Sequence, residues 1–262
     1  MKECSMSNES YLTRRRVLSA ALTTCATAVP AARALAQTPQ GFIGDLLFRP
    51  AEQPNGTVLF EVTKDFGYVD STGIRWQAKA GVQTDGASIP RIFWPIIGHP
   101  YEGLYLKAAV IHDYYCTTEN RYRKWENVHR VFYEAMQFNG VGAIKAALMY
   151  FAVWRFGPRW DIAELKPCTP GPNEFCASAQ VAGYRVFSEG VGAFDEKAEE
   201  ARLRDFQRLA ETKLPPLDQI PEIEARLPPI ARVRTTRDVD AKSDQGWYFR
   251  NPYRMPIAVP GK

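Results

Sequence analysis

The sequence predicts an α+β protein in which a small N-terminal antiparallel sheet packs on a three-helix unit and an irregular helical, proline-rich C-terminal extension follows. Short runs rich in β-branched and aromatic residues fill positions 41–81, and helical spacing of apolar residues fills positions 105–156. Prolines and charged residues dominate after Pro167. Strands that precede helices, rather than alternate with them, are typical of the α+β class.

The strand predictions rest on short apolar runs bounded by turn residues. They cover residues 45–48, 57–62, 66–69 and 74–78. The last two runs are separated by Asp-Ser-Thr-Gly at positions 70–73, and such a turn favours a hairpin.

Helices are expected at residues 105–115, 123–138 and 143–156, with a long charged helix at 194–212 in the extension. In the second helix, Trp125, Phe132 and Met136 recur at helical spacing and predict an apolar face. The third helix ends at a glycine followed by a proline, which is a common stop signal.

The chain divides into a signal peptide at residues 1–36, a core domain at 41–160 and a C-terminal extension at 161–262. The signal peptide is predicted from Arg14-Arg15, a short apolar run and a small-residue cleavage site that ends at Ala36. Paired arginines before apolar residues are typical of twin-arginine export. Cleavage near Ala36 predicts a periplasmic or secreted protein.

The alternatives for this N-terminus are an uncleaved membrane anchor and a lipoprotein modified at Cys25. The apolar run is shorter than the roughly 20 residues that span a bilayer, and the residues before Cys25 are a poor lipid-attachment motif. We therefore expect no transmembrane span in the mature protein.

The charge of the mature chain excludes one class of partner. Loss of residues 1–36 removes five basic and two acidic residues, which leaves 28 basic and 27 acidic residues and a net charge of +1. A chain this close to neutral has no bulk attraction for nucleic acid. We expect a small-molecule or lipid substrate instead.

Three cysteines remain in the mature chain. Cys168 and Cys176 bracket a loop-like segment, and in an oxidising compartment a disulfide between them is expected. Cys116 is then left without a cysteine partner.

The candidate site lies on the first two helices, which carry His112, Asp113 and His129. The chain has only three histidines, and two of them fall in this block. His129 lies on the apolar stripe of its helix and should face the core, so His112 and His129 could meet if the two helices pack together. A simpler interpretation is that both are core histidines that fasten the helices to each other.

The motifs in this block resemble a known family. Residues 84–90 (Thr-Asp-Gly-Ala-Ser-Ile-Pro), 108–115 (with His-Asp-Tyr-Tyr) and 132–136 are similar to the bacterial and phage family called domain of unknown function 1353. The resemblance covers about residues 41–157 and implies no established activity. The family commonly has an acidic residue where this chain has His129.

The same order of motifs resembles, more distantly, the secreted phospholipases A2 of bacteria and fungi. That resemblance implies calcium-assisted ester hydrolysis with His112 as the general base, Asp113 and Asp85 as metal ligands, and His129 in the place of the carboxylate that orients the base. Such a mechanism combines a base that titrates near neutral pH with a hard cation bound by oxygen ligands.

The same region also offers a zinc site. His112 and Cys116 are four residues apart and share a helix face, and His129 could supply a third ligand from the next helix. Two imidazoles and a thiolate suit zinc.

Two classes of function follow. The first is a metal-assisted hydrolase acting on lipid or cell-envelope esters, with Asp85, His112, Asp113 and His129 in one cleft within about 10 Å. The second is a non-catalytic structural or binding protein of the envelope. A His112 ring that faces an open cleft favours the first class, and a ring sealed in the core by protein contacts favours the second.

Overall fold

The computed structural model describes residues 39–52, 58–84, 89–90, 93–97, 103–166 and 182–253. Residues 37–262 form one compact unit by their contacts. The signal peptide, the Cys168–Cys176 pair and Asp85 lie outside the described residues.

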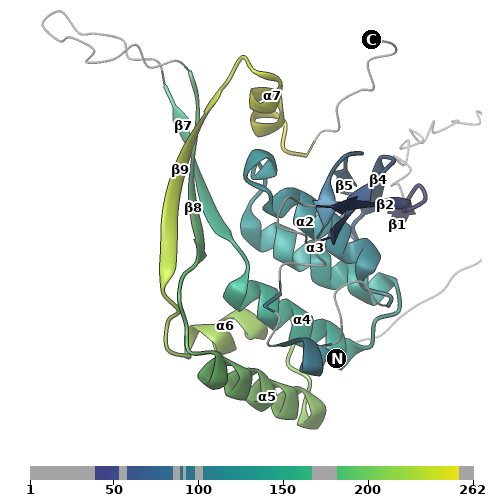
Figure 1. Ribbon diagram of the computed structural model, residues 1–262, viewed down its shortest axis with the longest axis vertical. Helices are drawn as coiled ribbons and strands as arrows, with labels where there is room; N and C mark the ends of the chain where they lie inside the picture. Colours follow the sequence, from purple (N-terminus) through teal and green to yellow (C-terminus); the bar gives the residue numbers. More distant parts are fainter. Residues whose placement is uncertain are drawn as a thin grey trace, which may run out of the picture. The chain divides into compact units, whose positions relative to one another are not determined.

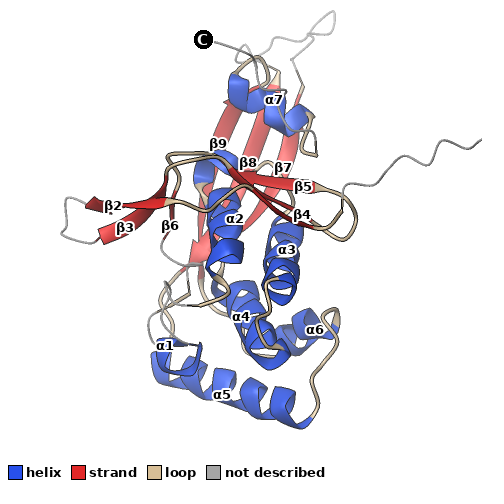
Figure 2. Ribbon diagram, turned by 90° about the vertical axis from the view of Figure 1, so that its right-hand side faces the viewer, coloured by secondary structure: helices blue, strands red, loops and turns tan. Residues whose placement is uncertain are grey.

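The N-terminal part of the core forms two small antiparallel sheets rather than one. The first has the order β1-β4-β5 and the second the order β2-β3-β6. Figure 2 shows the second sheet beside strands β4 and β5 of the first. Their strands are β1 (Gly41–Ile43), β2 (Phe48–Glu52), β3 (Val58–Val62), β4 (Phe66–Val69), β5 (Arg75–Ala78) and β6 (Gln83–Thr84).

The predicted hairpin at residues 66–78 is confirmed, because β4 and β5 pair directly and Val69 lies opposite Arg75. The buried carboxylate of Asp70 organises the turn, since it accepts hydrogen bonds from the backbone of Ile74 and from the indole of Trp76. The strand expected at residues 45–48 is wrong. The backbone of Gly44 has a φ of 79°, which interrupts an extended chain, and β1 and β2 lie on either side.

The predicted three-helix unit is confirmed. It consists of α2 (Leu106–Cys116), α3 (Trp125–Phe138) and α4 (Ala143–Phe156). Helix α2 packs on α3 and on strands β4, β5 and β6 (Figure 2). Its residues 108–116 are all buried, as expected for a helix covered on every side. The short helix α1 (Trp94–Ile97) contacts α4, and a 3-10 turn (Thr118–Asn120) follows α2.

The C-terminal extension contains more regular structure than the sequence predicts. Strands β7 (Arg159–Leu165), β8 (Gly183–Val191) and β9 (Arg232–Asp240) form an antiparallel sheet with β8 in the centre (Figure 1). The helices of the extension are α5 (Glu196–Thr212), α6 (Gln219–Ala225) and α7 (Asp244–Arg250). The charged helix expected at 194–212 is confirmed as α5, and the α+β class is confirmed for the protein.

Helices α5 and α6 pack on α4 (Figure 1), and a buried ion cluster joins the three helices. Arg155 of α4 donates two hydrogen bonds to Glu199 of α5, at 2.5 and 2.8 Å, and one of 2.8 Å to Glu224 of α6. It also donates to the carbonyl of Pro228. The Arg155 side chain is only 1% exposed, so this cluster fastens the extension to the core.

No helix within the described ranges is both long enough and apolar enough to cross a membrane.

Candidate metal centre

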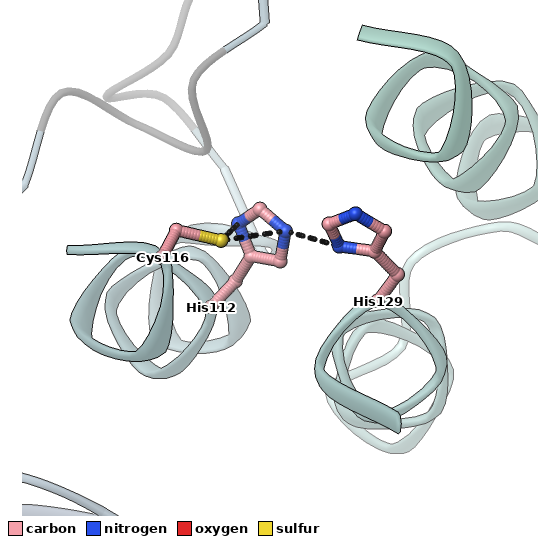
Figure 3. Close-up of side chains that lie close together, drawn as sticks. All are labelled: His112, Cys116 and His129. Carbon is pink, nitrogen blue, oxygen red and sulfur yellow. Dashed lines mark hydrogen bonds between the residues drawn. The ribbon is translucent and has the colours of Figure 1, made fainter. Parts of the chain in front are cut away.

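Helices α2 and α3 bring His112, Cys116 and His129 together in the core. His112 and Cys116 are one turn apart on α2 and therefore share a face of that helix. His129 lies on α3 and points its ring at His112 (Figure 3). Nε2 of His112 lies 2.9 Å from Nδ1 of His129 and 3.5 Å from Sγ of Cys116.

These separations are close to the edges of a zinc coordination tetrahedron. Zn–N bonds of about 2.0–2.1 Å and a Zn–S bond of about 2.3 Å place two ligand nitrogens about 3.3 Å apart and a nitrogen and a sulfur about 3.6 Å apart. The nitrogen–sulfur distance here is 3.5 Å and the nitrogen–nitrogen distance is 2.9 Å. The three donor atoms all lie within 4.8 Å of one another. The remaining edge, between Sγ of Cys116 and Nδ1 of His129, is bounded only by this 4.8 Å, so the side chains need to shift to bring all three donors onto one ion.

Electrostatics at this position favour a positive charge. Burial by itself lowers the pKa of His112, but the neighbouring Cys116 and Asp113 raise that pKa to about 10. Burial and the adjacent His112 hold the pKa of His129 well below its usual range. A charged His112 therefore donates its Nε2 proton to a neutral His129, and a cation can replace that proton between the same donor atoms.

Asp113 and Thr84 support the His112 ring from the side opposite His129. Nδ1 of His112 lies 3.4 Å from Oδ1 of Asp113, and the hydroxyl of Thr84 in β6 donates to Oδ2 of Asp113 at 2.5 Å. A carboxylate behind the second ring nitrogen fixes the tautomer of a metal-binding histidine and its orientation. Asp113 thus occupies the position of a carboxylate that supports a metal-binding histidine without contacting the ion itself.

The His129 ring is enclosed between aromatic side chains and the chain that leaves α4. Trp125 and Trp154 pack against it with ring centroids at 5.3 and 6.2 Å. Its Nε2 has no hydrogen-bond partner of normal geometry, and the backbone of Pro158 lies beside it. This arrangement leaves Nδ1 as the atom of His129 that faces His112.

Gly157 makes room for the His129 ring. A Cβ atom at position 157 would lie 2.8 Å from Cε1 and 2.9 Å from Nε2 of His129, and 2.3 Å from the carbonyl oxygen of Val153. The sequence indicated only a helix stop at this glycine. Its packing role depends on a residue of another helix, so no local pattern reveals it.

Replacement of Gly157 by Ala is expected to destabilise the protein by about 1–3 kcal/mol, because the added methyl group forces the His129 ring or the end of α4 to move. Chemical denaturation measures this change. Gly190→Ala is the control, since no atom lies within 4 Å of the Cβ it would add. Equal stability of Gly157→Ala and the wild type would contradict the packing described here.

A pocket of about 290 Å³ opens beside the cluster. Cys116 and Asp113 line it and are 7% and 5% exposed, whereas both histidines are fully buried. The other residues of its wall are Leu59, Gln83, Thr117, Arg121 and Pro158. Among the described residues of the cluster and its surroundings, Cys116 and Asp113 are the ones that connect it to this pocket.

The structure brings together three of the four residues proposed for the catalytic or metal site: His112, Asp113 and His129. Asp85 lies outside the described residues. The His112 ring does not face an open cleft; it is fully buried, and protein groups contact both of its nitrogens. Sequence patterns did not reveal the contact of Thr84 with Asp113 or the packing of Gly157 against His129, because these roles arise from contacts between elements.

Comparisons with known proteins show a family resemblance over part of this core. Residues 60–153 match the family described as protein of unknown function (DUF1353). The matched residues include helices α2 and α3, which carry the cluster, and strands β4, β5 and β6. The expected family resemblance is therefore confirmed over these residues. No match supports the resemblance to phospholipases A2.

Two curated relatives come from Sinorhizobium fredii (strain NBRC 101917 / NGR234). The chain is 40% identical to the uncharacterized protein y4jT over 160 residues, and this alignment covers 58% of this chain and 47% of y4jT. It is 46% identical to the uncharacterized protein y4iH over 110 residues, and that alignment covers 42% of this chain and 45% of y4iH. The chain thus spans about half the length of these relatives. No solved structure gives a significant match.

Proposed function

We propose that this DUF1353 protein binds a zinc ion through His112, Cys116 and His129. The observation that carries the proposal is the set of two imidazole nitrogens and one thiol sulfur within 4.8 Å of one another, with two of the three separations near those of a zinc tetrahedron. Carboxylate support behind His112 completes a common metal-site arrangement.

The same donor set favours zinc over calcium. Calcium takes six to eight oxygen ligands, whereas nitrogen and sulfur donors suit zinc. The carboxylate oxygens of Asp113 contact His112 and Thr84. Asp113 is accordingly proposed as a support for His112, in place of the ligand role that the phospholipase resemblance implied.

We further propose that the centre serves a metal-assisted hydrolase. Three protein ligands leave one position of a tetrahedral zinc ion for water or substrate, which is the pattern of catalytic zinc sites. Zinc in such a site lowers the pKa of a bound water to about 7 and polarises a carbonyl group. The pocket beside Cys116 gives a small ester access to this side of the cluster.

A second candidate is a non-catalytic envelope protein in which the cluster holds α2 to α3. The complete burial of His112 and the contacts at both of its ring nitrogens favour this candidate. In that case the cluster contributes to stability, with or without the ion.

Ester hydrolysis separates the two candidates. The zinc-loaded wild type should cleave short-chain nitrophenyl esters, whereas Cys116→Ser should lose the ion and the activity together because its hydroxyl is a poor zinc ligand. His99→Ala, which changes the third histidine of the chain, is the matched control. A folded, zinc-loaded wild type that cleaves no ester of a broad panel would favour the non-catalytic envelope protein.

We also propose export by the twin-arginine route and cleavage near Ala36, supported by the pattern of residues 1–36. Replacement of both Arg14 and Arg15 by Lys should retain the protein in the cytoplasm. Cell fractionation and N-terminal sequencing measure this, and an exported form that begins at Met1 would contradict the cleavage.

A further inference from the structure

Arg121 is held in a fixed position at the mouth of the pocket. Its Nε and Nη2 donate to the backbone carbonyl of Cys116, at 3.1 and 2.9 Å. Its guanidinium also lies 5.4 Å from the centre of the Trp160 ring. The residue that offers its thiol to the cluster therefore also anchors this cation.

The anchoring leaves part of the guanidinium for a ligand. An arginine has five N–H donors in a planar fork, and the carbonyl of Cys116 engages two of them. Within the described residues Arg121 forms no salt bridge, although it is half-buried, and it lines the pocket with Thr117 and Gln83. A half-buried guanidinium that lines a pocket and keeps donors beyond those bound to Cys116 suits a carboxylate or phosphate group.

We propose that Arg121 binds an oxyanion group of the ligand that enters this pocket. The inference rests on the proposed zinc centre, and it narrows the ligand to molecules that carry a carboxylate or phosphate near the reacting group. A ligand held at Arg121 extends along the pocket wall toward Cys116, because both residues line the same pocket. Arg121 is thus a binding residue that selects anionic substrates.

Cobalt-loaded protein gives a readout that does not require activity. Co²⁺ takes the place of zinc in such sites, and its visible spectrum responds to anions that bind at or beside the ion. Inorganic phosphate, acetate and vesicles of phosphatidylglycerol are added separately to the full mature chain. A spectral change with phosphate or acetate identifies a small free anion as the ligand. A change with the vesicles alone identifies a lipid headgroup as the ligand.

The variant Arg121→Gln should weaken this response at least about tenfold, because a charge-assisted bidentate contact is lost. Lys64→Gln, which removes an exposed cation outside the pocket, should leave it unchanged. Should Arg121→Gln lose the cobalt spectrum itself, Arg121→Lys takes its place, since it keeps the charge and lacks the fork.

A second measurement needs neither a variant nor a metal ion. Phosphate or acetate should slow the modification of Arg121 by phenylglyoxal, as followed by peptide mass spectrometry. A wild type that binds cobalt but responds to no oxyanion, or an equal response in Arg121→Gln, would overturn the inference and leave the metal centre standing. A wild type that binds no cobalt would instead overturn the metal centre.

Discussion

Replacement of Arg155 by Met should lower the free energy of unfolding by about 3–5 kcal/mol, because it leaves the Glu199 carboxylate buried without its main partner. Arg155 is 1% exposed and meets Glu199 with two hydrogen bonds. Arg202 also contacts Glu199 and offsets part of the loss. Equilibrium denaturation with urea measures the change.

The matched control is Arg204→Met on α5, the helix that carries Glu199. Arg204 pairs with Glu200 at 2.6 Å, but both side chains are exposed, at 50% and 38%. An exposed pair contributes less than about 1 kcal/mol. The double variant Arg155→Met/Glu199→Leu should recover much of the loss, since it removes both buried charges. If Arg155→Met and Arg204→Met cost the same, the buried cluster would not fasten the extension to the core.

Replacement of Cys116 by Ser should weaken zinc binding by more than about 100-fold. Loss of an outer-shell partner already costs about 10–100-fold, and the loss of a direct ligand exceeds that. Serine has nearly the shape of cysteine, so the fold should persist. Competition with a chromophoric chelator measures the affinity.

Two further variants are compared with Cys116→Ser in the same measurement of zinc affinity. Thr84→Val, which removes the hydrogen bond to Asp113, should weaken zinc binding by about 10–100-fold, because Asp113 then holds His112 less firmly. His99→Ala should retain the wild-type affinity. Equal zinc affinity of the wild type and Cys116→Ser would place the ion elsewhere.

The sequence predicted the parts of the site that depend on local periodicity. The apolar stripe of α3 correctly predicted that His129 faces the core. The spacing of His112 and Cys116 correctly predicted that they share one helix face. The 2.9 Å contact between His112 and His129 then followed from helix packing. The support from Thr84 and the space left by Gly157 depend on contacts between distant segments, so local patterns could not reveal them.

The sheet of the extension was missed for a similar physical reason. Strand β9 carries arginine, threonine and aspartate at most positions, and its residues are mostly exposed, so it lacks a clear apolar alternation. Its pairing with β8 is stabilised by cross-strand partners such as Arg185 and Asp238, which are 53 positions apart. Such pairs become evident only when the register is known.

The most direct test of the zinc centre is X-ray absorption at the zinc edge of the metal-loaded mature protein. The account predicts one sulfur at about 2.3 Å and nitrogen or oxygen atoms at about 2.0–2.1 Å around the ion. The sulfur signal should disappear in Cys116→Ser. A zinc ion surrounded only by nitrogen and oxygen atoms in the wild type, or a wild type that retains no zinc, would contradict the proposed centre.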